Sequence, residues 1–345
     1  MNESVLSFKD KYFGDKNFYK MTLTIAVPII IQNLLTNLVS MADNIMVGQL
    51  GTNQMSGVAI INQLFFVFNL LVFGGMSGAG LFSAQYFGQK NHNGVRDVFR
   101  MKILIGITII AISLSVMIFL HEPLINMFLH EGSSSGNIQE TFNYAKNYLY
   151  IMVIGIAPFV ISNCYSTTLK ESGQTVVPMK AGVLAVVFDI ILNYIFIFGK
   201  LGFPAMGVVG AAIATVISRF VECGYLVIYT HRHSNDYPFI KHCYRTLKVP
   251  GSLVKKIIVT GAPLMLNEFL WAGGLTLQTQ ALSTKGLATV GGLNICNTIG
   301  NISNCIFVTM GTTIAIVVGQ LLGAGKLKEA KVTATRMAAF SLLIS

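Results

Sequence analysis

The sequence has 345 residues, of which 53% are hydrophobic and only 11% are charged. A water-soluble domain carries about 25% charged residues, because its surface has to be hydrated. The composition therefore excludes an ordinary soluble enzyme, a disordered chain and a nucleic-acid-binding protein, although the formal net charge is +10. A lipid bilayer is the solvent that this composition fits.

Apolar runs long enough to cross a bilayer, roughly 20 residues each, recur along the chain. We predict nine membrane-spanning helices, at about 21–47, 55–84, 103–120, 143–168, 181–199, 207–230, 257–284, 290–322 and from 335 to the last residue. Helices are expected rather than barrel strands because the apolar runs are continuous. The polar start of the chain lacks the apolar core and cleavage site of a signal peptide, so the first span is expected to stay in place.

Lysine and arginine residues lie mostly on one side of the predicted membrane. With the N-terminus in the cytoplasm, twenty of the 24 fall on the cytoplasmic side, three fall outside, and Arg219 lies within a span. This count places Lys102 in the loop after the second span. Because cytoplasmic loops are enriched in basic residues, we expect a multi-pass protein of the plasma membrane with a cytoplasmic N-terminus. The basic excess then requires no nucleic-acid partner.

The sequence also contains an internal repeat at a constant offset of 235 residues. The matching pairs are Pro28 and Pro263, Gly51 and Gly286, Gly57 and Gly292, Asn62 and Asn297, Gln85 and Gln320, and Gly88 and Gly323. Six spans separate the two copies, so both copies start on the same side of the membrane. We therefore predict parallel repeats related by a pseudo-two-fold axis along the membrane normal.

The repeat predicts the organisation of the chain. We expect a cytoplasmic tail at 1–20, a first lobe of six helices at 21–230, a cytoplasmic linker at 231–256 and a partial second lobe at 257–345. Residue 345 corresponds to residue 110, inside the third span, so we expect a C-terminally truncated form of a twelve-span protein. The fold class is an all-α polytopic membrane protein with two parallel six-helix repeats, the second of them incomplete.

Polar residues inside the spans are candidate sites, because a charge at mid-bilayer costs about 2.5–3.5 kcal/mol on insertion scales. Asp189 and Asn193 lie one turn apart near the centre of the fifth span. A carboxylate beside an amide can take a proton or ligate Na⁺; the alternative is a structural hydrogen bond between helices. Asp43 either lines an outward-facing cavity or caps the first span before Gly48. Thr215, in the sixth span, can add a hydroxyl group.

The seventh span places Glu268 five residues after Pro263, the counterpart of Pro28. Proline removes a backbone donor and tends to kink a helix. Glu268 is therefore either a carboxylate of the transport site or a pairing group between the lobes. In the sixth span, the i, i+3 spacing of Arg219 and Glu222 favours an ion pair within the helix.

Asparagines share helical faces in the first and eighth spans. They either hold helices together or line a polar path, and they are Asn33, Asn37, Asn294, Asn297 and Asn301. The chain has no HExxH motif, P-loop or Cys/His cluster, and its five cysteines show no paired spacing. We therefore expect no enzyme, no catalytic residue, no metal site and no cofactor.

Three segments together form a specific pattern: residues 41–51 read MADNIMVGQLG, residues 189–199 read DIILNYIFIFG, and residues 207–215 read GVVGAAIAT. They resemble the span-1 aspartate with its V-G-x-L-G turn, the polar fifth span and the G-x-x-G-A-A-x-A-T segment of the multidrug and toxic compound extrusion (MATE) family of secondary antiporters. The resemblance runs from about Ala26 to Gly325.

This resemblance implies two six-helix lobes that form a V, and export of organic, often cationic, compounds in exchange for H⁺ or Na⁺. It implies ion coupling at Asp43, Asp189 and Asn193. Many members have the asparagine and aspartate of the fifth span in the opposite order, and have the span-7 glutamate about one turn further from the proline than Glu268.

Small-molecule substrates and the lipid bilayer are the expected partners, and a monomer is expected. The alternatives are a flippase of lipid-linked precursors from the same superfamily and a receptor that transports nothing. Several buried carboxylates against one buried basic residue, Arg219, favour export of cations over the flippase.

Overall fold

The structure, a computed structural model, describes residues 12–129, 137–283 and 287–344; of residues 272, 275–277, 279–283, 287–299 and 301–303 it describes the backbone only. The described residues form helices and connecting loops, without strands. The long helices are α2 (Lys16–Gly48), α3 (Thr52–Gly88), α4 (His92–Phe119), α6 (Ile138–Met152), α7 (Ile156–Glu171), α8 (Val176–Phe198), α9 (Val208–Arg232), α10 (Gly251–Ser283), α11 (Leu287–Gly323) and α12 (Leu327–Ile344). The short elements are α5 (His121–Asn126) and the 3₁₀ turns η2 (Val153–Gly155), η3 (Pro238–Ile240) and η4 (Cys243–Arg245).

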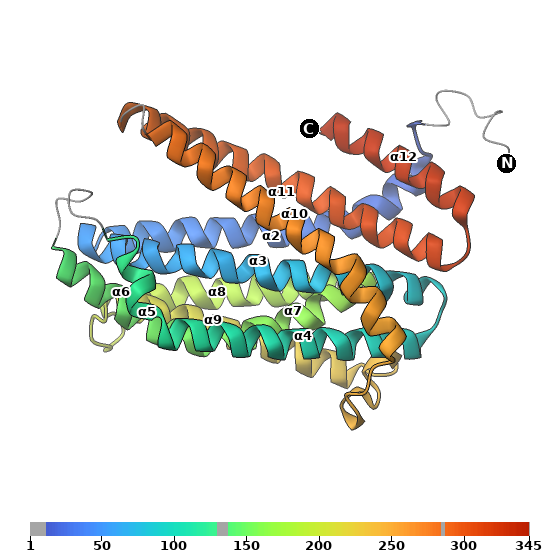
Figure 1. Cartoon of the computed structure of the whole chain (residues 1–345), viewed down its shortest axis with the longest axis horizontal. Helices are drawn as coiled ribbons and strands as arrows, with labels where there is room; N and C mark the ends of the chain where they lie inside the picture. Colours follow the sequence, from blue (N-terminus) through green and yellow to red (C-terminus); the bar gives the residue numbers. More distant parts are fainter. Residues whose placement is uncertain (1–11, 130–136, 284–286, 345) are drawn as a thin grey trace.

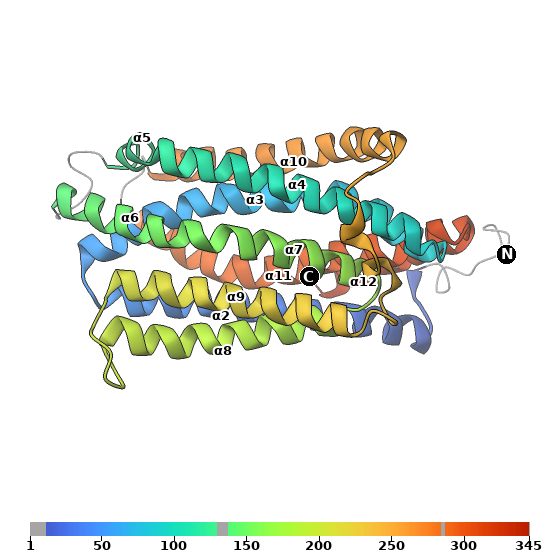
Figure 2. The same ribbon diagram turned by 90° about the horizontal axis from the view of Figure 1, so that it is seen from below.

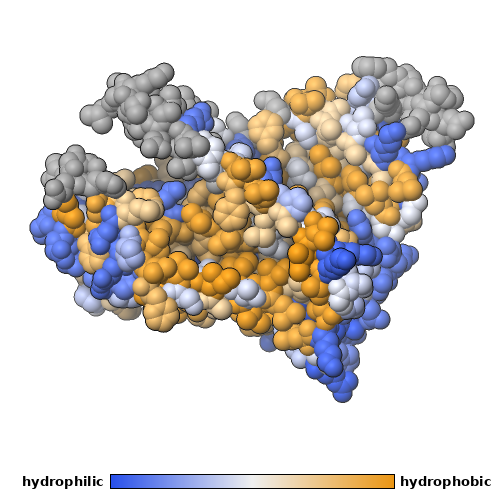
Figure 3. Space-filling view, viewed as in Figure 1, coloured by the Kyte–Doolittle hydropathy of each residue, from blue (hydrophilic) through white to orange (hydrophobic). Residues whose placement is uncertain are grey.

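Each of the nine predicted spans coincides with a long helix or, for the fourth, with α6, η2 and α7 together. Several helices extend beyond the apolar run: α2 begins at Lys16 and α10 at Gly251. Among the described residues, seven helical segments are long and apolar enough to cross a membrane. In the space-filling view, apolar side chains cover the middle of the molecule and polar ones gather at the two ends of the helices (Figure 3), as expected for a multi-pass membrane protein.

The break in the fourth span follows from its sequence. Pro158 has no backbone N–H to donate to the carbonyl of Ile154, and the chain forms the 3₁₀ turn η2 just before it. The carbonyl oxygen of Gly155, in this turn, accepts a hydrogen bond from Nη1 of Arg219 at 3.4 Å. The turn between α6 and α7 therefore accepts a hydrogen bond from a charged side chain of α9.

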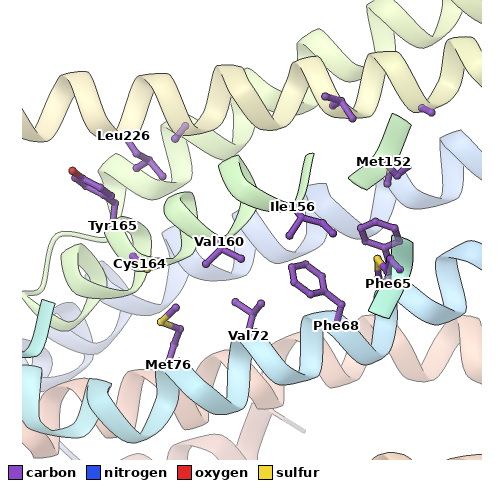
Figure 4. Close-up of a cluster of buried hydrophobic side chains, with 14 of the residues drawn as sticks. Phe65, Phe68, Val72, Met76, Met152, Ile156, Val160, Cys164, Tyr165 and Leu226 are labelled. Carbon is purple, nitrogen blue, oxygen red and sulfur yellow. The ribbon is translucent and has the colours of Figure 1, made fainter. Parts of the chain in front are cut away.

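Helices α2 to α9 form one lobe with a continuous apolar core (Figures 1 and 2). Its centre lies between α3 and α7, whose side chains point toward one another (Figure 4). The residues drawn there include Phe65, Phe68, Val72 and Met76 of α3, and Ile156, Val160 and Cys164 of α7. Helices α8 and α9 pack against each other, and α2 packs against α8.

The repeat seen in the sequence is present in the backbone. The starts of α2 and α10 (Lys16 and Gly251), of α3 and α11 (Thr52 and Leu287), and of α4 and α12 (His92 and Leu327) are each 235 residues apart. Helices α10, α11 and α12 therefore repeat the three-helix unit that α2, α3 and α4 form.

The two units meet through a reciprocal contact between α3 and α11. A Cβ atom at Gly88 would overlap the carbonyl oxygen of Gln320, and a Cβ atom at Gly323 would overlap that of Gln85. Gly88 and Gly323 are equivalent in the repeat, as are Gln85 and Gln320, so the contact has the self-complementary form that a two-fold axis requires. At this end glycine allows the backbones to touch.

Toward the opposite end, α10 and α11 lean away from the first lobe (Figure 1). Apart from the adjoining backbone of the same helix, no atom in the described part of the chain lies within 4 Å of the position that a Cβ would take at Gly273 or Gly274 of α10, or at Gly300 of α11. The units thus touch at one end and separate toward the other, which matches the V shape expected for the fold.

The segment between the two units is packed against α4. Arg100 donates from Nε to the carbonyl oxygen of Cys243 at 2.9 Å and from Nη2 to that of His242 at 3.0 Å. Arg96 similarly reaches the carbonyl oxygens of Pro238 and Phe239. Two arginines thus fasten the linker to the first lobe.

Burial affects the ionisation of this segment. Tyr237 is 6% exposed, and burial raises the pKa of its phenol to about 12. Burial likewise raises the pKa of the Cys243 thiol.

Candidate functional site

Three polar residues predicted from the sequence meet inside the first lobe. Asn193 of α8 donates from Nδ2 to Oδ1 of Asp43 on α2 at 2.6 Å, and to Oδ2 of Asp189, one turn earlier, at 3.1 Å. Asp189 is 3% exposed and Asn193 is fully buried. One amide therefore joins two carboxylates from two helices.

Helix α9 adds two hydroxyl side chains to this cluster. The side chains of Thr215 and Ser218 lie beside the carboxylate of Asp189, so the fourth predicted residue, Thr215, belongs to the same cluster. Ser218 was not identified from the sequence, although its position one turn from Thr215 could have suggested it. Oδ1 of Asp189 and Oδ1 of Asn193 accept no hydrogen bond from the described residues. These two buried oxygens are chemically suited to a small cation or a proton.

The predicted ion pair between Arg219 and Glu222 is wrong, because no salt bridge joins them among the described residues. The guanidinium of Arg219 lies between the rings of Phe65 and Phe159, with its Cζ atom 5.3 and 5.1 Å from their centroids. From there it acts electrostatically on Asp189. Glu222 interacts electrostatically with both Lys170 and Arg219, without a salt bridge to either among the described residues. The i, i+3 spacing permitted the pair, but cation–π packing and the Gly155 carbonyl hold the guanidinium elsewhere.

The asparagines predicted to line a polar path connect the two units. Asn33 donates from Nδ2 to Oγ1 of Thr309 at 3.0 Å, and Asn37 donates from Nδ2 to Sγ of Cys305 at 2.8 Å. Both acceptors are on α11, so these residues join α2 to the second unit. The side chains of Asn294, Asn297 and Asn301 lie outside the described residues.

The two prolines lie inside α2 and α10, at Pro28 and Pro263. Pro28 cannot donate to the carbonyl oxygen of Thr24, four residues earlier. That oxygen is a hydrogen-bond acceptor for Oγ1 of Thr175 at 3.4 Å. A side chain from the start of α8 therefore satisfies the group that the proline leaves free.

Glu268 lies apart from this cluster, in a cavity of about 380 Å³ between the two units. Helices α3, α7, α10 and α11 line it, mainly with apolar side chains such as Phe73 and Leu264. Its charged groups are Glu268 of α10 and the neighbouring Lys170 and Glu171 of α7. The sequence left two roles open for Glu268, a carboxylate of the transport site or a pairing group between the lobes. The α7 groups on the cavity wall were not identified from the sequence.

The placement of Lys102 in a loop is wrong. Lys102 lies about three turns into α4, is fully buried, and forms a salt bridge with Glu171 at 2.6 Å. Arg219 is therefore not the single buried basic residue of the first lobe. This pair could not be predicted from the sequence, because the two residues are far apart in the chain and neither follows a known motif.

Comparison with known proteins gives the family. The MatE family model matches residues 28–195 and 263–345. The chain belongs to the MatE family. The two matched segments begin at Pro28 and Pro263, the equivalent residues of the repeat. This assigns the chain to a family of transporters and not to one of enzymes.

Relatives and solved structures agree with this assignment. A probable multidrug resistance protein NorM of Thermotoga maritima is 30% identical over 308 residues, which are 89% of this chain and 64% of that protein. A probable multidrug resistance protein YoeA of Bacillus subtilis is 26% identical over 88% of this chain and 65% of its own length. The chain thus spans about two thirds of the length of these relatives.

Among solved structures, an outward-facing conformation of a multidrug resistance MATE family transporter has a TM-score of 0.79 and 23% identity, covering 96% of this chain and 71% of that one. A transporter of the MOP superfamily from Pyrococcus furiosus has a TM-score of 0.76 and 22% identity, covering 97% of this chain and 72% of that one. These similarities show the MATE fold, with its V-shaped arrangement of lobes.

Proposed function

We propose that the protein is a secondary antiporter that exports organic, mainly cationic, compounds in exchange for H⁺ or Na⁺. The observation that carries the proposal is the bridge from Asp43 through Asn193 to Asp189 in a chain of the MatE family. The names of the relatives support multidrug export, and the buried carboxylates support coupling to a cation.

The site has a physical reason to bind one cation. Two carboxylates joined by one amide repel each other in a region of low dielectric constant. The guanidinium of Arg219 acts on Asp189 and offsets one negative charge. One proton, or one Na⁺ ligated by the free oxygens of Asp189 and Asn193, would offset the other. No further cofactor is part of this proposal.

Ion binding at this site has a direct effect on helix packing. Asp43 belongs to α2, which also carries Asn33 and Asn37, the two residues bonded to α11. A change in the bond between Asp43 and Asn193 would shift α2 relative to α8 and so act on the contact between the units. Antiport requires that ion and substrate bias the same two-state element, and α2 is suited to that role.

The cavity between the units is the proposed place for the substrate. Its walls are largely apolar, and Glu268 supplies a carboxylate from the second unit. Such a combination suits a hydrophobic molecule with a positive charge. We also propose that the protein is a monomer of the plasma membrane with a cytoplasmic N-terminus, so that the closed end of the V faces the cytoplasm.

The proposal is tested with the complete protein in liposomes, with efflux of ethidium driven by an imposed pH or Na⁺ gradient. We expect Asp43→Asn and Asp189→Asn each to reduce gradient-driven efflux at least about tenfold, because the site then lacks the charge that attracts the ion. Exchange of labelled for unlabelled ethidium without a gradient should persist. The exposed Asp236→Asn serves as the control, and unchanged efflux in the two site variants would falsify the assignment.

The buried Lys102 does not support the flippase alternative. Lys102 is paired with Glu171, so it offers no free positive charge to a pyrophosphate group. Export of organic cations therefore remains the better-supported function.

A further inference from the structure

The buried ammonium group of Lys102 is surrounded by four hydrogen-bond acceptors. Its Nζ atom lies 2.8 Å from Oε1 and 2.6 Å from Oε2 of Glu171, 3.0 Å from Oγ1 of Thr167 and 3.2 Å from Oγ1 of Thr168. Four oxygens from one helix thus surround three N–H donors from another. All three N–H donors of Lys102 therefore have acceptors inside the lobe.

The two threonines can only accept from Lys102, because their own protons are used elsewhere. Oγ1 of Thr167 donates to the carbonyl oxygen of Asn163 at 2.7 Å, and Oγ1 of Thr168 donates to that of Cys164 at 2.8 Å. The arrangement is therefore built for a cation on this side of Glu171.

The other side of Glu171 faces the cavity between the units. Its side chain keeps 12% exposure, and its residue lines the cavity together with Glu268 of α10. Gly80 makes this position possible, because a Cβ there would overlap Oε1 of Glu171. Lys170, in the same wall, interacts electrostatically with Glu222 of α9.

The repeat equivalent of Lys102 carries no charge. The repeat equivalent of Lys102 is Met337 of α12, which is also fully buried. An apolar side chain of similar length therefore fits this position of the repeat unit. Replacing a buried ion pair with apolar groups is often neutral for stability, so a buried pair beside a cavity points to function.

We propose that Glu171 is a second carboxylate for organic cations in the cavity between the units, and that Lys102 is its internal counter-ion, which limits the affinity. The inference rests on the proposed function, in which this cavity takes an organic cation. A carboxylate oxygen has lone pairs for two partners, so Glu171 can keep Lys102 and still attract a cation in the cavity. Lys102 weakens that attraction by offsetting most of the charge.

The test measures binding of two probes to the complete protein in nanodiscs, without any ion gradient. Tetraphenylphosphonium is a permanent cation, and triphenylphosphine oxide is a neutral molecule with similar rings. For the cation we expect the affinity order Lys102→Met, wild type, Lys102→Met/Glu171→Gln, Glu171→Gln, from tightest to weakest. Glu171→Gln should lose at least about tenfold, since it leaves Lys102 uncompensated, whereas the affinity for the neutral probe should change less than about twofold in every variant.

The double variant Lys326→Met/Glu329→Gln is the matched control, because it removes an exposed Lys–Glu pair outside the cavity, and it should bind both probes as the wild type does. The double variant Lys102→Met/Glu171→Gln removes both charges of the pair, so it provides a folded variant even where a single variant, which leaves one buried charge unpaired, is unstable. Equal loss of both probes in Glu171→Gln, or loss of the cation in Lys102→Met, overturns the inference. A wild type that binds the cation no better than the neutral probe overturns the proposed substrate class together with this inference, whereas cation binding that Glu171→Gln leaves unchanged overturns this inference alone.

Discussion

The first three helices and their copy have the same backbone arrangement but differ in the charges that they carry. The residues that bring α3 and α11 together are kept between the copies: Gln85 with Gln320, and Gly88 with Gly323. The residues that carry charge are not kept, since Asp43 corresponds to Gln278, Asn33 to Glu268 and Lys102 to Met337.

This difference separates two roles. A close contact on a pseudo-two-fold axis has to be matched on both sides, because each residue meets the other's equivalent. A charge buried in the membrane is expensive, and a single site suffices to bind one ion. The symmetric residues therefore hold the units together, whereas the asymmetric residues supply the chemistry.

The largest effect is expected at the symmetric contact. Gly88→Ala and Gly323→Ala would each place a Cβ on a facing carbonyl oxygen, so the units could not approach at this end, and efflux should fall at least about tenfold. Spin labels across α3 and α11 should report a longer distance. Gly300→Ala, on α11 but with nothing within 4 Å, is the control. Clearly unequal effects of the two variants would contradict the symmetry of the contact.

The next effect concerns the order of the two polar residues in α8. Asp189→Asn alone removes a carboxylate, and Asn193→Asp alone adds one beside Asp43, so each should reduce ion-driven efflux at least about tenfold. The double variant Asp189→Asn/Asn193→Asp keeps two carboxylates and one amide, and should retain roughly half of the activity or more. Efflux measured under a pH gradient and under a Na⁺ gradient would check this. A double variant as inactive as the singles would show that the position of each charge matters, and not only their number.

A smaller effect is expected at the contact between α4 and the linker, because the equivalent residue of α12 is not an arginine. Arg100 binds two linker carbonyls, whereas its counterpart in α12 is Thr335. Arg100→Ala should release residues 238–245, and amide hydrogen exchange there should rise about tenfold, which corresponds to about 1.4 kcal/mol. The exposed Lys241→Ala is the control. Protection that stays the same in Arg100→Ala would mean that apolar packing alone holds the linker.

The smallest effect concerns Tyr237, which belongs to the linker and so to neither copy. Its pKa is raised to about 12 by burial from about 10 in an unfolded chain. The docked linker binds the phenol proton more tightly than the released linker, so docking is unaffected below pH 10 and weakens as the pH rises from about 10 to 12. The phenolate absorbance of the wild type minus that of Tyr237→Phe would show this titration. A difference curve centred near pH 10 would contradict the burial argument.

Much of the fold could be predicted from the sequence, because its main signals are one-dimensional. The length of an apolar run is set by the bilayer, and a repeat is visible as a constant offset whether or not the chain is folded. The helix starts at Lys16 and Gly251 could not be predicted, because both helices continue into polar residues beyond the apolar run.

The candidate site was predicted in part. Asp189 and Asn193 belong to one helix, where a spacing of four residues fixes their relation. Their meeting with Asp43, 150 residues away from Asn193, was implied by the family resemblance and not by the spacing. The role of these residues in ion coupling stays a prediction, and the asparagines of the eighth span lie outside the described residues.

The sequence by itself determined the membrane environment, the positions of the spans, the parallel repeat and the carboxylates that the spans contain. The tertiary structure alone decided where the buried charges lie: Lys102 pairs with Glu171, and Arg219 lies between two aromatic rings. The physical reason is that hydrophobicity and helical periodicity act between neighbours in the chain. The partner of a buried charge is chosen by helices that pack together from distant parts of the sequence.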